Sequence, residues 1–256
     1  IQMNNKLNIR YLYLVLLGVV ILGILAVSVG YGLVREDNIT FIDDQIGEII
    51  TALKEKGMYD DAIICFTADH GDMLGDHYHW RKTYPYEGSA HIPYVVKWPS
   101  YVKKSVPNGT KIEQPVELRD FLPTFIDLAG GAVPPDMDGS SLLKLVQGHS
   151  DEWRKYIDLE HATCYSADNY WCALTDGKLK YVWNFHNGKE QLFDLQKDPG
   201  ELTDCSEKKA YAKQLKELRK AMVDHLSERG DDYVKNGELV TLEKTILYSP
   251  NFPQKI

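Results

Sequence analysis

Basic residues are too few in this sequence for a nucleic-acid-binding protein. The 256 residues include 29 Lys and Arg against 37 Asp and Glu, which gives a formal net charge of -8. The most basic stretches are short pairs such as Lys103-Lys104 and Lys208-Lys209. Proteins that bind nucleic acid hold its phosphates with clustered Lys and Arg. The sequence therefore predicts no nucleic-acid partner.

Cysteine is also scarce, and internal repeats and low-complexity segments are absent. None of the four cysteines stands at a metal-ligand spacing such as C-x-x-C, which argues against a structural zinc site. Cys65 lies in an apolar run and is expected to be a buried thiol. Cys164 and Cys172 could approach each other across a hairpin in an oxidising compartment, but their spacing does not fix a disulfide.

Charge is missing altogether from residues 11–34, which are mostly apolar. A stretch of this length can cross a hydrocarbon core, which needs about 20 apolar residues. The apolar region of a cleaved signal peptide is shorter, about 7–15 residues, so a signal-anchor helix is favoured. Lys6 and Arg10 precede the stretch and favour an exported remainder. We therefore expect a membrane-anchored or exported protein, on a bacterial surface or in the periplasm; the alternative is that this segment is foreign to the downstream domain.

Apolar periodicity predicts a globular α/β protein after residue 37. A helix is expected over 41–56, with Thr40 and Asp43 as a capping pair and Gly57 at its end. Unbroken apolar runs at 62–67 and 92–98 are typical of strands buried on both faces. The remaining expected elements are a helix at 118–129, antiparallel strands at 170–174, 179–184 and 191–195 with Asp-Gly and Asn-Gly turns, and a helix at 211–226. The predicted domains are 1–37, an anchor-like helix and flank; 38–150, an α/β core; and 151–256, a small antiparallel sheet with a helix.

The residues with the clearest chemistry come directly after the first predicted strand. Asp69 and His70 stand at its carboxyl end, the edge at which ligands gather in open α/β sheets. A carboxylate beside an imidazole suits a divalent cation. Gly71 is expected to let the backbone turn sharply. The alternative is that Asp69 caps a helix and His70 is an ordinary surface residue.

The pattern around this pair resembles the sulfatases of the alkaline phosphatase superfamily. Their strand ends in S/T-x-D-[HN]-G-[DE], followed by x-x-G-D-H and a lysine, which match residues 67–77 and Lys82. Similar family segments are found in order at 38–47, 86–93, 120–124, 138–142, 192–195 and 198–201. So many ordered matches point to family membership. The resemblance implies the C-terminal part of the sulfatase sheet-and-helix core.

The resemblance also implies site residues. It makes Asp69 and His70 ligands of a divalent cation, usually Ca²⁺, while relatives with the Asp-His version use Mn²⁺ or Zn²⁺. It makes Lys82 the catalytic cation on the sulfate and leaving-group oxygens, where an ammonium lowers the barrier electrostatically. His77, Trp80 and His91 are expected to line the pocket of a sulfated small molecule or glycan, or to support it. A solvated lysine is the alternative for Lys82.

The family's nucleophile is not encoded in these 256 residues. Sulfatases make a formylglycine from the first residue of a C/S-x-P-S-R motif, and no such motif is present. The expected function is sulfuric ester hydrolysis by a metal-dependent family, here as a C-terminal fragment inactive alone. Two alternatives stay open: a membrane-anchored pseudoenzyme that binds a sulfated glycan, and a membrane-tethered phosphoethanolamine-transferase-like enzyme.

Overall fold

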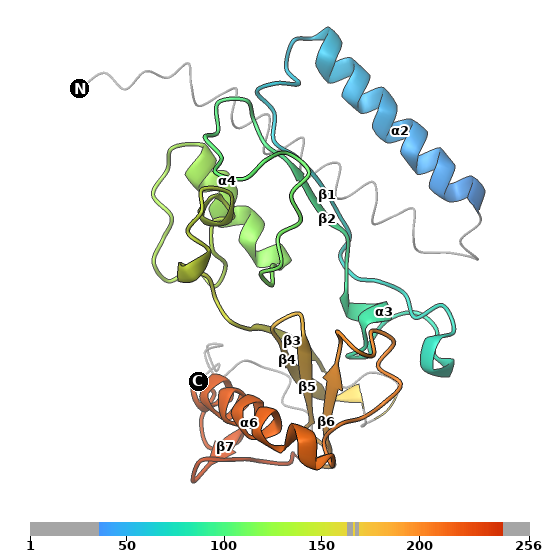
Figure 1. The fold of residues 1–256 in the computed structure, drawn as a ribbon, viewed down its shortest axis with the longest axis vertical. Helices are drawn as coiled ribbons and strands as arrows, with labels where there is room; N and C mark the ends of the chain where they lie inside the picture. Colours follow the sequence, from blue (N-terminus) through green and yellow to red (C-terminus); the bar gives the residue numbers. More distant parts are fainter. Residues whose placement is uncertain (1–35, 163–165, 167–168, 243–256) are drawn as a thin grey trace, which may run out of the picture. The chain divides into compact units, whose positions relative to one another are not determined.

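The structure is a computed structural model, and it describes residues 36–162, 166 and 169–242. These residues form two compact units (Figure 1). The first contains the described residues up to Asp69 together with 92–111 and 117–152, and the second contains 70–91, 112–116 and the described residues from Trp153 onward. The predicted domain limits at residues 37 and 150 stay predictions. The segment 70–91, however, groups with the C-terminal sheet and not with the strand that precedes it.

Two of the predictions fall outside the described residues. The charge-free stretch 11–34, predicted to form an anchor helix, is one, and Cys164 is the other. Among the described helices, none has the length and apolarity needed to cross a membrane.

The first unit opens with helix α2, Glu36–Glu55. Its length confirms the predicted helix, and Gly57, at φ 63°, ends it as expected. The predicted cap is wrong, because Thr40 lies inside the helix. The helix begins at Glu36, four residues before the predicted capping residue.

The first unit also contains a two-stranded antiparallel sheet. Strand β1, Ile64–Thr67, pairs with β2, Tyr94–Lys97, and sets Phe66 opposite Val95. The prediction that both strands are buried on both faces is wrong: Phe66 is 39% and Val95 61% exposed. Two strands alone cover little of each other's faces, so side chains on one face stay in solvent.

The rest of the first unit packs around a buried aspartate. The 3₁₀ turn η2, Leu118–Asp120, leads into α4, Phe121–Leu128, as predicted for 118–129. Asp120 is fully buried, and its carboxylate accepts the backbone N–H of Glu117 at 3.0 Å and of Ser140 at 2.8 Å. The unit ends in the short helices α5, Leu143–Val146, and η3, Ser150–Glu152.

The second unit is built on a four-stranded antiparallel sheet in the order β3-β4-β5-β6. The strands span Ile157–His161, Trp171–Thr175, Leu179–Asn184 and Glu190–Asp194. The last three confirm the predicted strands, with Gly177 and Gly188 at positive φ in the turns. The prediction missed β3. The unit also contains η1, Asp76–Tyr78; α3, Glu87–Ala90; η5, Lys209–Tyr211; α6, Ala212–Ser227; β7, Val234–Lys235; and β8, Glu238–Leu239.

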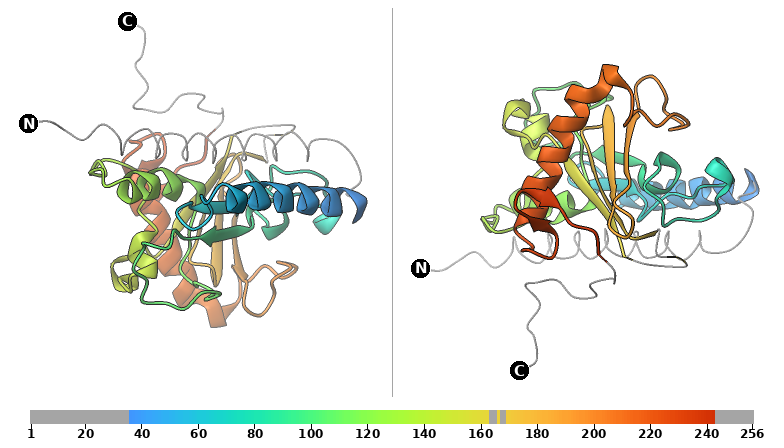
Figure 2. Two further views of the ribbon diagram at one scale, coloured as in Figure 1. Left: turned by 90° about the horizontal axis from the view of Figure 1, so that it is seen from above. Right: turned by 90° about the horizontal axis from the view of Figure 1, so that it is seen from below.

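Both faces of this sheet are covered. Helix α6 crosses one face (Figure 2) and packs Leu218, Met222 and Leu226 against Cys172 and neighbouring core residues. On the other face Val182 and Phe193 pack with Tyr86, which belongs to the segment 70–91. Alternate residues of a strand point to opposite faces, so β4 is buried along its whole length.

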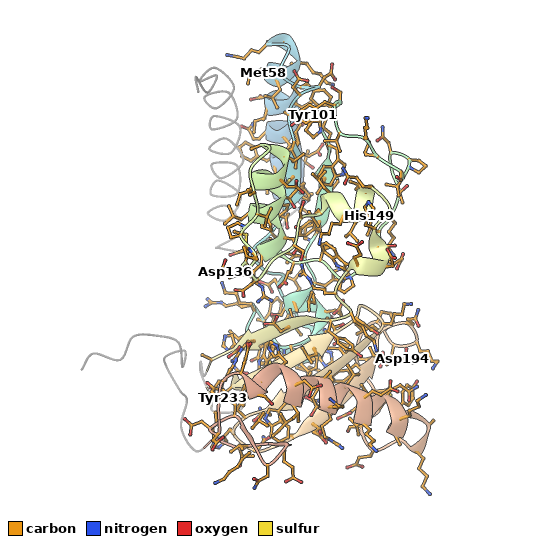
Figure 3. All side chains as sticks on the ribbon, turned by 90° about the vertical axis from the view of Figure 1, so that its left-hand side faces the viewer. Met58, Tyr101, Asp136, His149, Asp194 and Tyr233 are labelled. Atoms are coloured by element: carbon orange, nitrogen blue, oxygen red, sulfur yellow. The ribbon has the colours of Figure 1, made fainter. Side chains whose placement is uncertain are left out.

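The ends of α6 are fixed to the sheet side by polar and aromatic contacts. The Tyr211 hydroxyl donates to the Asp194 carboxylate at 2.7 Å before the helix begins. Tyr233 follows the helix and packs in the same core. Figure 3 labels Asp194 and Tyr233 near opposite ends of α6. The segment 70–91 therefore packs on one face of the sheet, and α6 packs on the opposite face.

Candidate functional site

The predicted site residues follow strand β1 directly. β1 ends at Thr67, and Asp69 and His70 come next, which confirms their place after a strand. Gly71, expected to allow a sharp turn of the backbone, does not have a positive φ. A Cβ there would lie 2.1 Å from the Gly88 carbonyl oxygen, so glycine is required by close approach. The Gly71 N–H also donates to the Ser89 carbonyl at 2.8 Å, which joins the two ends of the segment.

His70 and Lys82 lie together, as the resemblance implies. The Lys82 Nζ atom is 2.6 Å from Nε2 of His70, and Nδ1 of His70 is 2.7 Å from the Gly71 carbonyl oxygen. A carbonyl only accepts, so Nδ1 donates the proton and Nε2 holds the lone pair that faces the Lys82 ammonium. The Lys82 side chain is exposed, so its charge is accessible to an anion.

The loop between His70 and Lys82 is closed at its base by Asp72. One carboxylate oxygen of Asp72 accepts the N–H of Leu74 at 2.9 Å and of Arg81 at 3.0 Å. Five residues other than glycine have positive φ in or beside this loop: Leu74, His77, Tyr78, Arg81 and Thr83. Such conformations cost about 1–3 kcal/mol each and persist only where the surroundings enforce them. The contacts around the loop, including the two bonds of Asp72, therefore stabilise these backbone conformations.

The three predicted pocket residues have different surroundings. The His77 ring stacks on Tyr86 at 3.9 Å between centroids, and its Nε2 lies 2.9 Å from the Gly200 carbonyl oxygen. These contacts are those of a supporting residue. Trp80 is 64% exposed, and His91 is exposed with Nδ1 2.8 Å from the Glu87 carboxylate. Trp80 and His91 can therefore meet a ligand directly, and the substrate-binding roles stay predictions.

The structure adds a buried charge cluster that sequence reasoning missed. The Lys180 ammonium, fully buried in β5, lies 2.6 Å from Glu87 and 2.8 Å from Glu201. Burial raises the pKa of Glu87, but hydrogen bonds from His91 and Lys180 outweigh it and hold the value at about 2. Burial dominates at Glu201 and raises its pKa. The sequence signal for this cluster was Lys180 itself, a charged residue within the mostly apolar strand predicted at 179–184.

The donor set for a cation is incomplete in the described part of the chain. His70 fits a ligand role, because Nδ1–H donates to a backbone carbonyl and leaves Nε2 as the donor atom, as in metal-binding histidines. Asp69 is exposed. The described residues contain no group of three or more His, Cys, Asp or Glu side chains that could hold a metal ion. The ligand roles of Asp69 and His70 therefore stay predictions.

Comparison with known proteins identifies the family. Residues 75–228, more than half of the chain, match the family described as N-sulphoglucosamine sulphohydrolase, C-terminal. An arylsulfatase of Clostridium perfringens is 37% identical over 203 residues, which cover 79% of this chain and 41% of the relative. An N-acetylglucosamine-6-O-sulfatase of Bacteroides thetaiotaomicron is 30% identical over 198 residues, which cover 75% of this chain and 35% of the relative.

Comparison with a solved structure supports the same family at the level of the fold. The structure of a protein in complex with its substrate D-glucosamine-2-N,6-O-disulfate superimposes with a TM-score of 0.63 at 25% identity, covering 75% of this chain and 39% of that one. This chain thus spans about two fifths of the length of these relatives. The family match, the ordered motifs and the fold agree, and the chain belongs to the sulfatase family, of which it matches the C-terminal part.

Proposed function

We propose that this chain supplies the sulfate-recognising cation, Lys82, of an enzyme that hydrolyses a sulfate ester. The observation that carries the proposal is the exposed Lys82 ammonium, 2.6 Å from His70, on a loop fixed by Asp72. When the ester bond breaks, negative charge grows on the leaving oxygen. An ammonium held in advance near that charge lowers the barrier, because no reorganisation is needed during the reaction.

Asp69 and His70 would contribute an oxygen and a nitrogen ligand to a divalent cation, for which Ca²⁺ is the expectation in this family. When bound, such a cation neutralises anionic oxygens of a substrate. The tautomer of His70 supports this role, because its Nε2 lone pair is kept free of a proton. Lys82 occupies that lone pair in the structure, so a cation and Lys82 would compete for Nε2.

A sulfated sugar is the proposed substrate class. One relative is named as an N-acetylglucosamine-6-O-sulfatase, and one structural neighbour holds a sulfated glucosamine. Exposed Trp80 and His91 support the proposal, since an aromatic face and an imidazole suit a sugar ring and its hydroxyl groups. The charge-free stretch 11–34 supports an exported or membrane-anchored location, where polysaccharides are met.

Binding without turnover is the second candidate for this chain by itself. The observation that favours it is the absence of a C/S-x-P-S-R motif from the 256 residues. Lys82 can bind sulfate without that motif, but nothing identified in the sequence would attack the sulfur.

Calorimetry with glucosamine 6-sulfate and with unsulfated glucosamine tests the proposal on the full chain. Only the sulfated sugar should bind, and Lys82→Met should weaken its binding by about tenfold, the effect of one charged contact. Lys178→Met removes the same charge from an exposed turn and should leave affinity unchanged. Equal losses in the two variants would defeat the proposal.

Hydrolysis of 4-nitrophenyl sulfate separates the two candidates. No turnover by the full chain, with Lys82-dependent binding intact, supports binding alone. Turnover abolished by Lys82→Met supports hydrolysis by this chain and requires a nucleophile other than formylglycine.

A further inference from the structure

Lys180 is a charged group in a place where charge is costly. Its side chain is fully buried in β5, and an unpaired ammonium would be strongly destabilising there. Its three donors are all used: Nζ lies 2.6 Å from Glu87, 2.8 Å from Glu201 and 2.8 Å from the Pro85 carbonyl oxygen. The Lys180 ammonium thus has a hydrogen-bond acceptor for each of its three protons, and all three acceptors belong to segments outside β5.

The partners of Lys180 come from two distant parts of the chain. Pro85 and Glu87 follow Lys82 in sequence, and Glu201 closes the Asp-Pro-Gly-Glu turn after β6. The two glutamates are also joined directly, since the Glu87 N–H donates to the Glu201 carboxylate at 2.5 Å. Glu201 has a φ of 54°, in the left-handed region, which its contacts must enforce. Lys180 therefore ties both segments to one point of the sheet.

Further bonds hold the same segment at both sides of this cluster. The Trp171 indole N–H of β4 donates to the Thr83 carbonyl at 2.9 Å. The His77 Nε2 lies 2.9 Å from the Gly200 carbonyl oxygen, next to Glu201. Glu87 also contacts His91 at 2.8 Å, so the buried cluster reaches a predicted pocket residue at the surface. Lys82 and His91 stand at the two ends of the anchored stretch.

Stability alone does not account for a buried ionic cluster. Buried ion pairs can often be replaced by apolar side chains of similar volume with no loss of stability. What apolar side chains cannot do is fix one register through directed hydrogen bonds. Here the directed bonds end on residues 85–87, three to five residues from Lys82.

We propose that Lys180, Glu87 and Glu201 are positioning residues for anion recognition. They fix the segment 83–91 on the sheet and so hold Lys82 and His91 in place for the sulfate group of a substrate. The link to sulfate rests on the proposed function, whereas the anchoring of the segment does not.

The test compares Lys180→Met with the double variant Lys180→Met and Glu201→Leu in the full chain. The single variant leaves two carboxylates without their lysine and lowers the melting temperature. The double variant removes one of them and regains much of that loss. Both variants lose the hydrogen bonds of Lys180, so hydrogen exchange at the amides of Glu87, Ser89, Ala90 and His91 should rise by about tenfold or more. The amides of β4 and β5 should stay protected in the double variant. Lys197→Met, at an exposed lysine that pairs with the buried Asp194, is the matched control and leaves exchange unchanged.

Affinity for inorganic sulfate is measured on the same proteins. The double variant should lose about fivefold or more in affinity despite its recovered stability. The positioning role is overturned if the amides of 87–91 exchange in the double variant at the wild-type rate. It is also overturned if the exchange rates of β4 and β5 rise equally. If Lys82→Met binds sulfate as the wild type does while 87–91 exchange fast in the double variant, the proposed function fails and the anchoring holds.

Discussion

At the scale of residues, the candidate site depends on polar side chains that hold the backbone around it. Asp72 closes the loop before Lys82, and Lys180 anchors the stretch after it. Asp120 plays a similar part in the first unit, where it holds the loop at Ser140. Asp72 and Asp120 belong to segments that resemble the family, and both bind backbone N–H groups.

The stability of the Glu87 contacts should depend on pH in a defined direction. Its pKa falls from an ordinary value of 4.5 to about 2, so the folded state binds protons less readily than the unfolded state. Its contribution is therefore complete above about pH 4.5 and is lost as the pH falls through about 2. Relative to Glu87→Gln, the wild type should be about 2 kcal/mol more stable at pH 6 and should lose most of that difference by pH 2.

Urea unfolding of both proteins between pH 2 and 7 measures this difference. Glu217→Gln changes an exposed carboxylate on α6 and should show no such trend, since its pair with Lys213 is 3.9 Å long and solvated. A stability difference that is independent of pH would contradict the assignment.

At the scale of elements, α6 supplies the support behind the sheet. Its apolar residues recur at helical spacing, and Leu218, Met222 and Leu226 are buried against β4 and β5. The same spacing predicted the helix over 211–226. Helical spacing also predicted α2, although Phe41 of that helix is 64% exposed.

Met222→Ala should weaken the second unit strongly. Met222 is fully buried, and truncation of such a side chain costs about 2–5 kcal/mol from lost burial and a residual cavity. Lys220→Ala on the exposed face breaks only a surface pair with Asp224 and should cost about 0.5 kcal/mol or less. Denaturant unfolding followed by near-ultraviolet circular dichroism of the buried tryptophans reports both. Equal effects would mean that α6 does not brace the sheet.

At the scale of the whole molecule, the chain carries part of a sulfatase. It belongs to the family by its C-terminal match, and it spans about two fifths of the length of its relatives. Asp69 and His70 are its proposed cation ligands, and the described residues hold no group of three or more possible ligands. Activity of the whole enzyme is therefore a proposal, and the chain's own proposed part in it is the recognition of sulfate.

Calcium should bind this chain weakly. Ca²⁺ takes about 6–8 oxygen ligands, and Asp69 with His70 gives one carboxylate and one nitrogen, so the dissociation constant should exceed about 1 mM. Isothermal titration of the full chain measures it. Asp69→Asn should remove what binding remains, and Asp231→Asn, at another exposed aspartate, should not. Micromolar binding that survives Asp69→Asn would show that the cation is held elsewhere.

The sequence by itself determined the family, the order of most elements and the residues around Lys82. Local spacing determines whether a segment is amphipathic, and ordered motifs identify a family without coordinates. It could not give the start of α2, the exposure of Phe66 or the missed strand β3, because these depend on what lies beyond the segment itself. Only the tertiary structure decided that Lys180, Glu87 and Glu201 meet, since Glu87 is 114 residues from Glu201 and reaches it only when the chain packs on one sheet. A lysine buried in a strand is intelligible once its partners are known, because burial of a charge is tolerated only where other segments bring the opposite charge.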